Sequence, residues 1–210
     1  MSTLWDDRFI TDPVALENWL YGKQSLSGMT RDWFINEVKK WPKNTTLLDA
    51  GCGGGVTGYQ LQNKSLLDNI RYTGLDGSVC MLDLAKKKVT HKNASWVLSS
   101  LDTFSSETKF DKILLRAVIE HNLDPRAILT SVAAALKPGG ALYVIFWNNP
   151  VFEGDAVIKK IRDGFYDNSH KMSDITDTLE HCRVVLTRKE WIKEQSEGSK
   201  ERFIAVFTKA

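Results

Sequence analysis

One stretch of the sequence joins a short apolar run to an acid and a cluster of glycines. It runs from Thr46 to Gly55 and reads Thr-Leu-Leu-Asp-Ala-Gly-Cys-Gly-Gly-Gly. An apolar run that ends in glycines predicts a buried parallel strand followed by a tight turn. Because glycine lacks a Cβ atom, the backbone can approach a ligand closely there, and a helix from Val56 to Gln62 can begin beside it. The stretch therefore predicts a nucleotide-binding turn in an α/β sheet.

The spacing of the glycines separates two kinds of nucleotide site. A dinucleotide turn has its third small residue five positions after the first glycine, and five positions after Gly51 this chain has a valine. Gly53, Gly55 and Gly58 fit the dinucleotide spacing but begin two residues too late to follow the strand directly. Asp49, just before the turn, suits a ligand with an ammonium group better than one with phosphates. The pattern favours a nucleoside with an amino-acid tail over a dinucleotide.

The rest of the chain alternates expected strands with expected helices, which is typical of an α/β sheet. The expected strands are Ile70–Asp76, Ala94–Leu98, Phe110–Arg116 and Ala141–Trp147, and the expected helices between them are Ser78–Lys88 and Pro125–Leu136. Helices are then expected over Asp155–Phe165 and Ser173–His181, and an antiparallel hairpin from Arg183–Thr187 and Arg202–Phe207. Ligands of open α/β sheets bind outside the carboxyl ends of the strands, so we expect the site there.

Length and composition suit one domain of residues 1–210. The chain has 42% apolar and 26% charged residues, as ordinary globular proteins do. Its three cysteines form no CxxC pair, so neither a disulfide framework nor a metal site is expected. The net charge of +2 argues against a nucleic-acid partner. No apolar run has the length of a membrane span and the N-terminus lacks a signal-peptide layout, so we expect no membrane partner and a cytoplasmic location. The oligomeric state is left open.

Three segments resemble the motifs of class I S-adenosylmethionine-dependent methyltransferases. Leu48–Gly55 resembles the first motif, Leu75–Ala85 the second, and Phe110–Gly140 the later part of the core. The resemblance covers roughly residues 45–147. It implies a Rossmann-like sheet of seven mostly parallel strands with an antiparallel C-terminal hairpin and helices on both faces. It also implies S-adenosylmethionine as the cofactor.

The same resemblance implies a set of cofactor-binding residues. Asp76 ends its strand, where a carboxylate can accept two hydrogen bonds from ribose hydroxyls. Met81 is expected either against the adenine, as in the family, or as an ordinary core residue. The full candidate set is Asp49, Gly51, Gly53, Asp76, Gly77, Met81, Ser100, Leu101 and Arg116.

Two of these positions carry open alternatives. Where the family commonly has an acid that binds the adenine amino group, this chain has Ser100. Either the Ser100 hydroxyl with the backbone of Leu101, or Asp102 two residues on, is expected to take that role. Arg116 is expected to place its backbone against the cofactor or its side chain against an anionic acceptor, or else to be a surface arginine.

The residues on either side of the core are expected to enclose the ligands. Residues 1–41 carry four tryptophans and two expected helices, Asp12–Tyr21 and Thr30–Lys40. This helical cover is either a lid that excludes water from the cofactor and substrate or simple packing along the sheet. After the fifth strand, Asn148–Glu153 is expected to wall the acceptor pocket, within a C-terminal part of residues 148–210.

His121 is the candidate catalytic residue. Methyl transfer from a sulfonium needs mainly alignment and the exclusion of water, and a base helps only when the nucleophile must lose a proton. His121 follows the fourth strand and titrates near neutral pH, so it is either that base or a residue with a structural or substrate-orienting role. The expected acceptor is an oxygen or nitrogen of a small organic molecule. The alternatives are an RNA or protein methyltransferase and a cofactor-binding subunit without activity.

Overall fold

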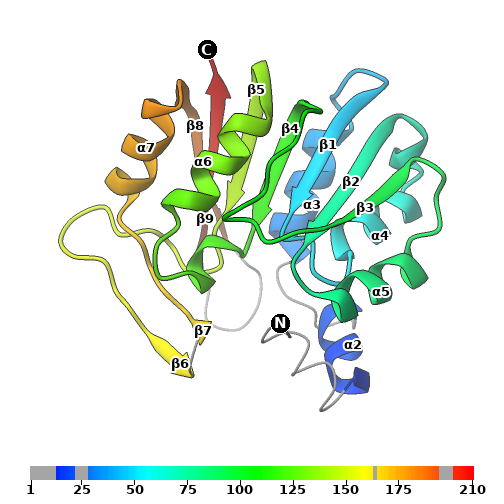
Figure 1. Cartoon of the computed structure of the whole chain (residues 1–210), viewed down its shortest axis with the longest axis horizontal. Coiled ribbons are helices and arrows are strands. Elements are labelled where there is room, and N and C mark those ends of the chain that lie inside the picture. The colour runs from blue at the N-terminus through cyan, green and yellow to red at the C-terminus, as the bar shows by residue number, and fades with distance from the viewer. Residues whose placement is uncertain (1–12, 22–27, 163–164, 194–200) are drawn as a thin grey trace. The chain divides into compact units, whose positions relative to one another are not determined.

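The computed structural model describes residues 13–21, 28–162, 165–193 and 201–210 (Figure 1). The chain forms two compact units, residues 1–99 and residues 100–210. Each unit has its own strands and its own buried core. The prediction of a single domain over residues 1–210 stays a prediction.

The first unit holds three parallel strands, with β2 between β1 and β3. Leu47, Leu48 and Leu75 are fully buried in these strands, as expected for a parallel sheet covered by helices. Its elements, in order, are α2 Pro13–Tyr21, α3 Gly28–Val38, β1 Thr45–Ala50, α4 Val56–Asn63, the 3₁₀ helix η1 Leu66–Asp68, β2 Ile70–Asp76, α5 Val79–Lys88 and β3 Ala94–Leu98.

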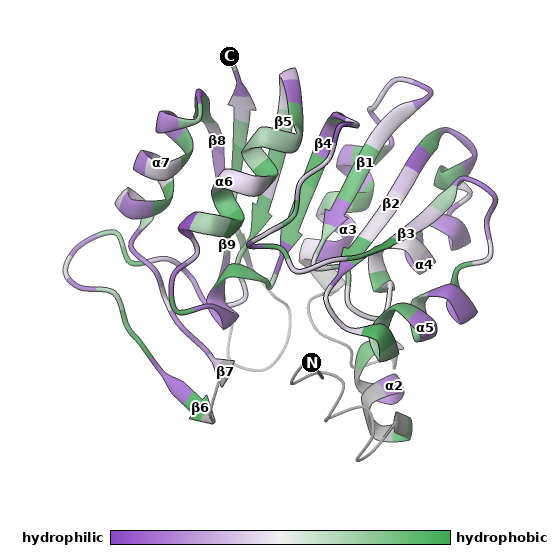
Figure 2. Cartoon of the chain, in the orientation of Figure 1, coloured by the Kyte–Doolittle hydropathy of each residue, from purple (hydrophilic) through white to green (hydrophobic). Residues whose placement is uncertain are grey.

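The second unit holds four strands of its main sheet. β5 pairs in parallel with β4 and antiparallel with β9, which pairs antiparallel with β8. The helices α6 and α7 contact each other, and Figure 2 shows their alternation of apolar and polar residues. Its elements are β4 Phe110–Arg116, η2 Ile119–His121, α6 Arg126–Ala135, β5 Leu136–Ile145, β6 Lys160–Arg162, β7 Phe165–Tyr166, α7 Met172–His181, β8 Val184–Lys193 and β9 Glu201–Lys209.

The predicted fold class is confirmed. The main sheet has seven strands, mostly parallel, and ends in the antiparallel hairpin of β8 and β9. The strands Ile70–Asp76, Ala94–Leu98 and Phe110–Arg116 have the predicted bounds. The expected N-cap Asp12 and the hairpin turn 195–200 lie outside the described residues.

The helix predicted over Asp155–Phe165 is wrong. The structure instead has the short strands β6 and β7, which pair antiparallel, and a bridge between Val157 and Ser169. Val157 and Ile158 are both at least half exposed, so a helix here would have no buried face to stabilise it. These exposed apolar residues therefore precede a short pair of strands and belong to no helix.

β5 begins earlier than predicted, at Leu136, so the sequence Lys137–Gly140 lies within the strand. Gly139 has a φ of 72° and the pairing register shifts beside it, which accommodates these residues as an irregularity in the strand. The glycine pair that was expected to separate the helix from the strand therefore lies inside β5.

The N-terminal helices differ in how they are packed. In α3, Phe34, Ile35 and Val38 are buried, so this helix contributes to the core of the first unit. In α2, the Tyr21 hydroxyl donates a hydrogen bond to the carbonyl of Gly54, so this helix contacts the glycine turn. The lid function of the N-terminal segment stays a prediction. A lid over the cofactor would lie against the glycine turn, and the helix that makes such a contact is α2.

The glycine turn depends on left-handed backbone at alternate positions. Gly51, Gly53 and Gly55 have φ values of 78°, 52° and 82°. A Cβ atom at Gly55 would lie 2.7 Å from the Cβ of Ala85, whereas a Cβ atom at Gly53 would meet nothing within 4 Å. Gly55 is therefore required for both conformation and packing, and Gly53 faces open space.

Replacing these two glycines by alanine should have unequal effects. Gly53→Ala should cost about 1 kcal/mol, because only the left-handed backbone opposes it. Gly55→Ala should cost about 2 to 4 kcal/mol, because the overlap with Ala85 adds to the same backbone strain. Urea unfolding of the two variants measures the difference, and equal losses would contradict the packing role of Gly55.

Candidate active site

Asp76 joins the end of β2 to the glycine turn. Its Oδ2 accepts the backbone N–H of Gly53 at 2.8 Å and its Oδ1 accepts the N–H of Ser78 at 2.9 Å. These two bonds hold the carboxylate in one orientation at the carboxyl end of the strand. A carboxylate has about four acceptor positions in all, so a carboxylate that accepts backbone N–H groups can also accept from hydroxyl groups of a ligand.

The first residues of the glycine turn are fixed to β2. The N–H groups of Gly51 and Cys52 both donate to the carbonyl of Leu75, at 2.8 and 2.9 Å. The next residue, Gly53, is bound to Asp76 and has open space where a side chain would be. The structure therefore brings together two predicted site residues, Gly53 and Asp76, beside a backbone that a ligand can approach.

Asp49 lies at the end of β1, two residues before Gly51, and is 2% exposed. Its Oδ2 accepts a hydrogen bond from the hydroxyl of Tyr72 at 2.7 Å. The sequence indicated Asp49 but gave no role to Tyr72. A buried carboxylate needs such a donor, and the tyrosine on the neighbouring strand provides it.

The remaining predicted residues of the first unit, Gly77 and Met81, follow Asp76 in the sequence. Gly77 is exposed, and Met81 is 3% exposed in α5. Ser78 caps this helix, since its Oγ accepts the N–H of Met81 at 3.1 Å. This burial agrees with the core alternative for Met81, and a contact with adenine stays a prediction.

In the second unit, the two candidate adenine-binding residues bind each other. The Ser100 hydroxyl donates to Oδ1 of Asp102 at 2.5 Å, and both residues are exposed. Ser100 and Asp102, the two alternatives expected from the sequence for binding the adenine amino group, are thus hydrogen-bonded to each other. The adenine contacts of Ser100 and Leu101 stay predictions, as does the role of Arg116, which ends β4 half-buried.

His121 is held in one orientation by a backbone carbonyl. Its Nδ1 lies 3.0 Å from the carbonyl oxygen of Tyr166, so this nitrogen carries the proton and donates it. In the neutral ring Nε2 is then the unprotonated nitrogen. Burial lowers the pKa of His121 below its ordinary value, so the ring is neutral at pH 7 and can accept a proton.

The segment that follows β7 fixes the rest of the His121 loop. The side-chain amide of Asn168 donates to the carbonyl of Asn122 at 2.9 Å. The Nε2 of His170 donates to the carbonyl of Ile119, also at 2.9 Å. Both side chains are buried, so two polar residues far along the sequence hold η2 at the end of β4.

Sequence reasoning missed the neighbour of His121. Glu120 is 1% exposed, and its Oε1 accepts the N–H of Trp147 at 2.5 Å. Its Oε2 has no hydrogen-bond partner within the part of the chain that the structure describes. Burial raises the pKa of Glu120 to about 7, and the charge of Asp167 adds to this. The only signal in the sequence was an acid directly after three apolar residues.

The segment after β5 is fixed by its two asparagines. The amide of Asn148 donates to Oδ1 of Asp167 at 2.6 Å, and the amide of Asn149 donates to the carbonyl of Glu201 at 2.8 Å. Both amides therefore have structural partners. The role of Asn148–Glu153 as a wall of the acceptor pocket stays a prediction.

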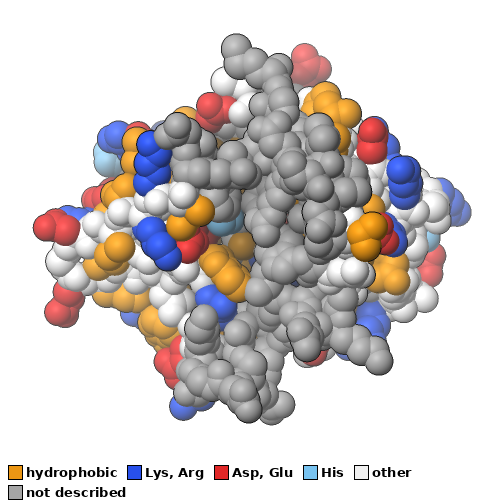
Figure 3. All heavy atoms as spheres, turned by 90° about the horizontal axis from the view of Figure 1, so that it is seen from below, with side chains coloured by type: hydrophobic (Ala, Val, Ile, Leu, Met, Phe, Trp, Pro, Cys, Tyr) orange, Lys and Arg blue, Asp and Glu red, His pale blue; other side chains and the backbone are white. Residues whose placement is uncertain are grey.

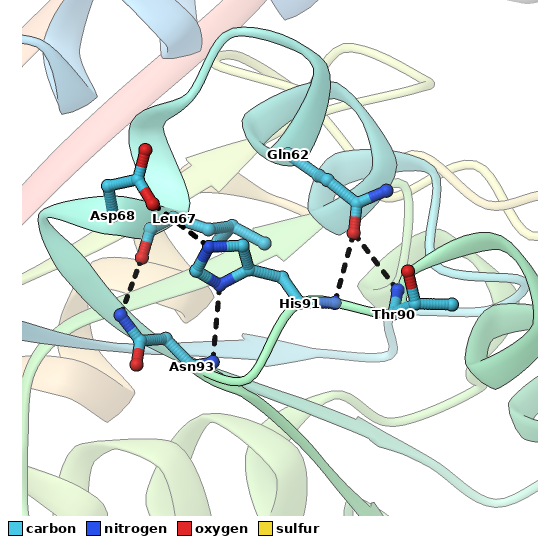
Figure 4. A network of polar contacts seen from close by, with 6 residues as sticks. All are labelled: Gln62, Leu67, Asp68, Thr90, His91 and Asn93. Atoms are coloured by element: carbon cyan, nitrogen blue, oxygen red, sulfur yellow. Dashed lines mark hydrogen bonds and ion pairs between the residues drawn. The ribbon is translucent and has the colours of Figure 1, made fainter.

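His91 has a structural role. Its Nε2 lies 3.1 Å from Oδ1 of Asp68, and its Nδ1 accepts the N–H of Asn93 at 3.2 Å (Figure 4). The Oε1 of Gln62 accepts the N–H groups of both Thr90 and His91. This network ties the end of α4 and η1 to the turn before β3, away from the residues described above.

Two features of the described residues concern a metal site and a membrane-spanning helix. Within residues 13–21, 28–162, 165–193 and 201–210, no cluster of three or more His, Cys, Asp or Glu side chains could hold a metal ion. No described helix is long and apolar enough to cross a membrane. Figure 3 shows hydrophobic side chains interspersed with charged ones on the described part of one face.

The family model described as a methyltransferase domain matches residues 42–197 of the chain. The chain belongs to the class I S-adenosylmethionine-dependent methyltransferase family. The match includes the glycine turn, Asp76 and His121, so the resemblance noted in the sequence is confirmed.

Among curated relatives, the mitochondrial ubiquinone biosynthesis O-methyltransferase of Candida albicans is 25% identical over 189 residues. The match covers 84% of this chain and 52% of the relative. A relative of the same name from Coxiella burnetii is 30% identical over 104 residues, covering 48% of this chain and 43% of its own length. The chain thus spans about half the length of these relatives.

Solved structures agree with the fold. An S-adenosylmethionine-dependent methyltransferase from Clostridium acetobutylicum has a TM-score of 0.66 at 17% identity, covering 96% of this chain and 99% of its own. At this identity the likeness establishes the fold, and the activity of the whole protein must be argued from its residues.

Glu120 should make the stability of the protein depend on pH. The unfolded carboxyl titrates near 4.5 and the folded one near 7, so the folded state binds more protons between these values. The contribution is complete below pH 4.5 and is lost as the pH rises through 7, by about 3 kcal/mol in total. Glu120→Gln should remove this loss.

Urea unfolding at about pH 5 and about pH 7.5 measures the effect. The matched control Glu153→Gln changes an exposed glutamate and should keep the wild-type dependence. If the free energy of unfolding changed equally with pH in Glu120→Gln and in the wild type, the pKa of Glu120 would not be raised by folding.

Proposed function

We propose that the protein transfers a methyl group from S-adenosylmethionine to an oxygen or nitrogen of a small organic molecule. The observation that carries this proposal is the arrangement at Asp76, whose carboxylate is fixed by Gly53 and Ser78 beside an open glycine turn. A nucleoside with two ribose hydroxyls fits a carboxylate held in this way. The names of the curated relatives favour oxygen as the acceptor atom.

The residues of the first unit fit the proposed cofactor. Gly53 leaves open the space that a side chain would fill, Asp76 would bind the ribose, and Asp49 would bind the ammonium group. When bound, the cofactor supplies a methyl group on a sulfonium, which needs no further activation. Ser100, Leu101 and Arg116 stay candidates for the adenine and the remaining groups.

His121 is the proposed general base. Its Nδ1 donates to the carbonyl of Tyr166, so Nε2 can take the proton that an acceptor hydroxyl loses as it attacks. For an ammonium acceptor, Nε2 would take the proton first and leave the amine lone pair that attacks the methyl group. Its lowered pKa keeps Nε2 unprotonated at neutral pH. The bond between His121 and Tyr166 thereby selects both the tautomer and the orientation that a base requires.

Two other functions remain as alternatives to the small-molecule enzyme. An RNA or protein methyltransferase is less favoured, because the net charge is only +2 and the amides of Asn148 and Asn149 are bound within the protein. A cofactor-binding subunit without activity would not need a histidine with a defined tautomer. The cytoplasmic location stays a prediction, and the Candida relative is named mitochondrial.

One experiment separates these functions. The protein is incubated with cofactor labelled on its methyl group and with separate pools of metabolites, RNA and proteins. Label in the metabolite pool is the expected result. Label in RNA or protein would replace the proposed acceptor class, and binding of the cofactor without transfer to any pool would indicate a subunit without activity.

Asp76→Ala should weaken binding of S-adenosylhomocysteine by well over tenfold, because two hydrogen bonds to a charged acceptor are lost. Isothermal calorimetry measures this affinity, and the wild type should bind S-adenosylhomocysteine but not NAD. The control Asp83→Ala removes an exposed carboxylate from α5 and should change nothing. Unchanged affinity in Asp76→Ala would remove this residue from the site.

His121→Ala should reduce turnover at least about a hundredfold while cofactor affinity stays nearly the same. The wild-type rate should fall with acid only below the ordinary imidazole value of 6.5, because the pKa of His121 is lowered. The control His181→Ala changes an exposed histidine in α7 and should keep full turnover. Normal turnover in folded His121→Ala would leave alignment as the whole mechanism.

A further inference from the structure

Tyr72 and Asp49 form a buried pair on neighbouring strands. Tyr72 is 1% exposed, and its hydroxyl donates to Oδ2 of Asp49 at 2.7 Å. In the parallel register Asp49 lies opposite Gly74, two residues beyond Tyr72, so the two side chains point to the same face of the sheet. The tyrosine thus reaches along β2 to the acid at the end of β1.

The ring of Tyr72 is held on two sides. A Cβ atom at Gly58 of α4 would lie 3.1 Å from Cε1 and Cζ of this ring, so the helix backbone lies close against it. Trp96 of β3 meets the ring edge-on, with centroids 5.7 Å apart and an interplanar angle of 69°. A ring confined in this way keeps its hydroxyl aimed at one place.

The donor in this pair is neutral. A lysine or arginine at the same place would cancel the charge of Asp49, whereas a phenol orients the carboxylate and leaves its charge intact. A further ionisable group beside Asp49 is Cys52, a buried thiol. Burial, followed by the charges of Asp49 and Asp76, raises the pKa of Cys52, so the thiol stays neutral.

We propose that Tyr72 is a positioning residue that orients the Asp49 carboxylate toward the ammonium group of the cofactor. The proposal rests on the function proposed above, because it takes Asp49 as the partner of that ammonium group. The Tyr72 hydroxyl acts on the cofactor through Asp49, to which it donates its hydrogen bond. Its removal should therefore weaken binding of the amino-acid tail and leave binding of the adenosine part unchanged.

Two ligands test this separation. S-adenosylhomocysteine carries the ammonium group, whereas methylthioadenosine has the same adenosine and sulfur but no amino-acid tail. Calorimetry on Tyr72→Phe should show about a tenfold loss of affinity for S-adenosylhomocysteine. The affinity for methylthioadenosine should change less than about twofold. Asp49→Asn should give the same selective loss, and the double variant should lose little more than either single one.

The control is Tyr59→Phe, which removes the hydroxyl of a half-buried tyrosine in α4 and should leave both affinities unchanged. If Tyr72→Phe does not fold, Tyr72→Met also lacks the hydroxyl, is flexible enough to fill the space, and allows the same comparison. Equal losses for the two ligands, or no loss for either, would overturn the proposal. A wild type that binds neither ligand would instead overturn the proposed function.

Discussion

The hydrogen bonds of Asp76 are the constraint on which the first unit's site depends. One carboxylate accepts from the glycine turn and from the start of α5, through Gly53 and Ser78. The N–H group of Gly53 belongs to no strand or helix, and the Asp76 carboxylate accepts its hydrogen bond while the glycines keep their left-handed backbone. The same residue that would bind the ribose therefore also shapes the loop that would approach it.

The second unit also has a loop with left-handed backbone at the end of a strand, and different residues bind it. The loop after β4 has no glycine, and Ala117 takes a left-handed φ of 53° there. Glu120, Asn168 and His170 are buried around it and bind its backbone and that of the neighbouring strand. These polar contacts maintain an unfavourable backbone conformation, as often seen where a protein positions a reactive side chain. Here that side chain is His121.

Local sequence patterns were sufficient to predict the strands of the sheet, but they did not predict the polar contacts around the loop after β4. Apolar runs ending in Asp49 and Asp76 located β1 and β2, because a parallel strand is buried on both faces and its end is marked by a polar residue. The carbonyl of Tyr166 that holds His121 is 45 residues away in the chain, and His170 is 51 residues from Ile119, so no periodicity connects these partners. The wrong helix over Asp155–Phe165 has a different origin, because β6 pairs locally with β7, Lys160 with Tyr166, in a segment whose apolar side chains are exposed.

The space around Tyr72 bears on how glycines in such chains are compared. Gly58 completes a dinucleotide-like spacing with Gly53 and Gly55, yet what it meets is an aromatic ring and not a phosphate. The residue types at positions 58 and 72 are therefore coupled by volume: a relative with a smaller residue in place of Tyr72 has room for a side chain in place of Gly58. In an alignment, these two columns should vary together, and the third glycine should not be scored as part of a ligand fingerprint.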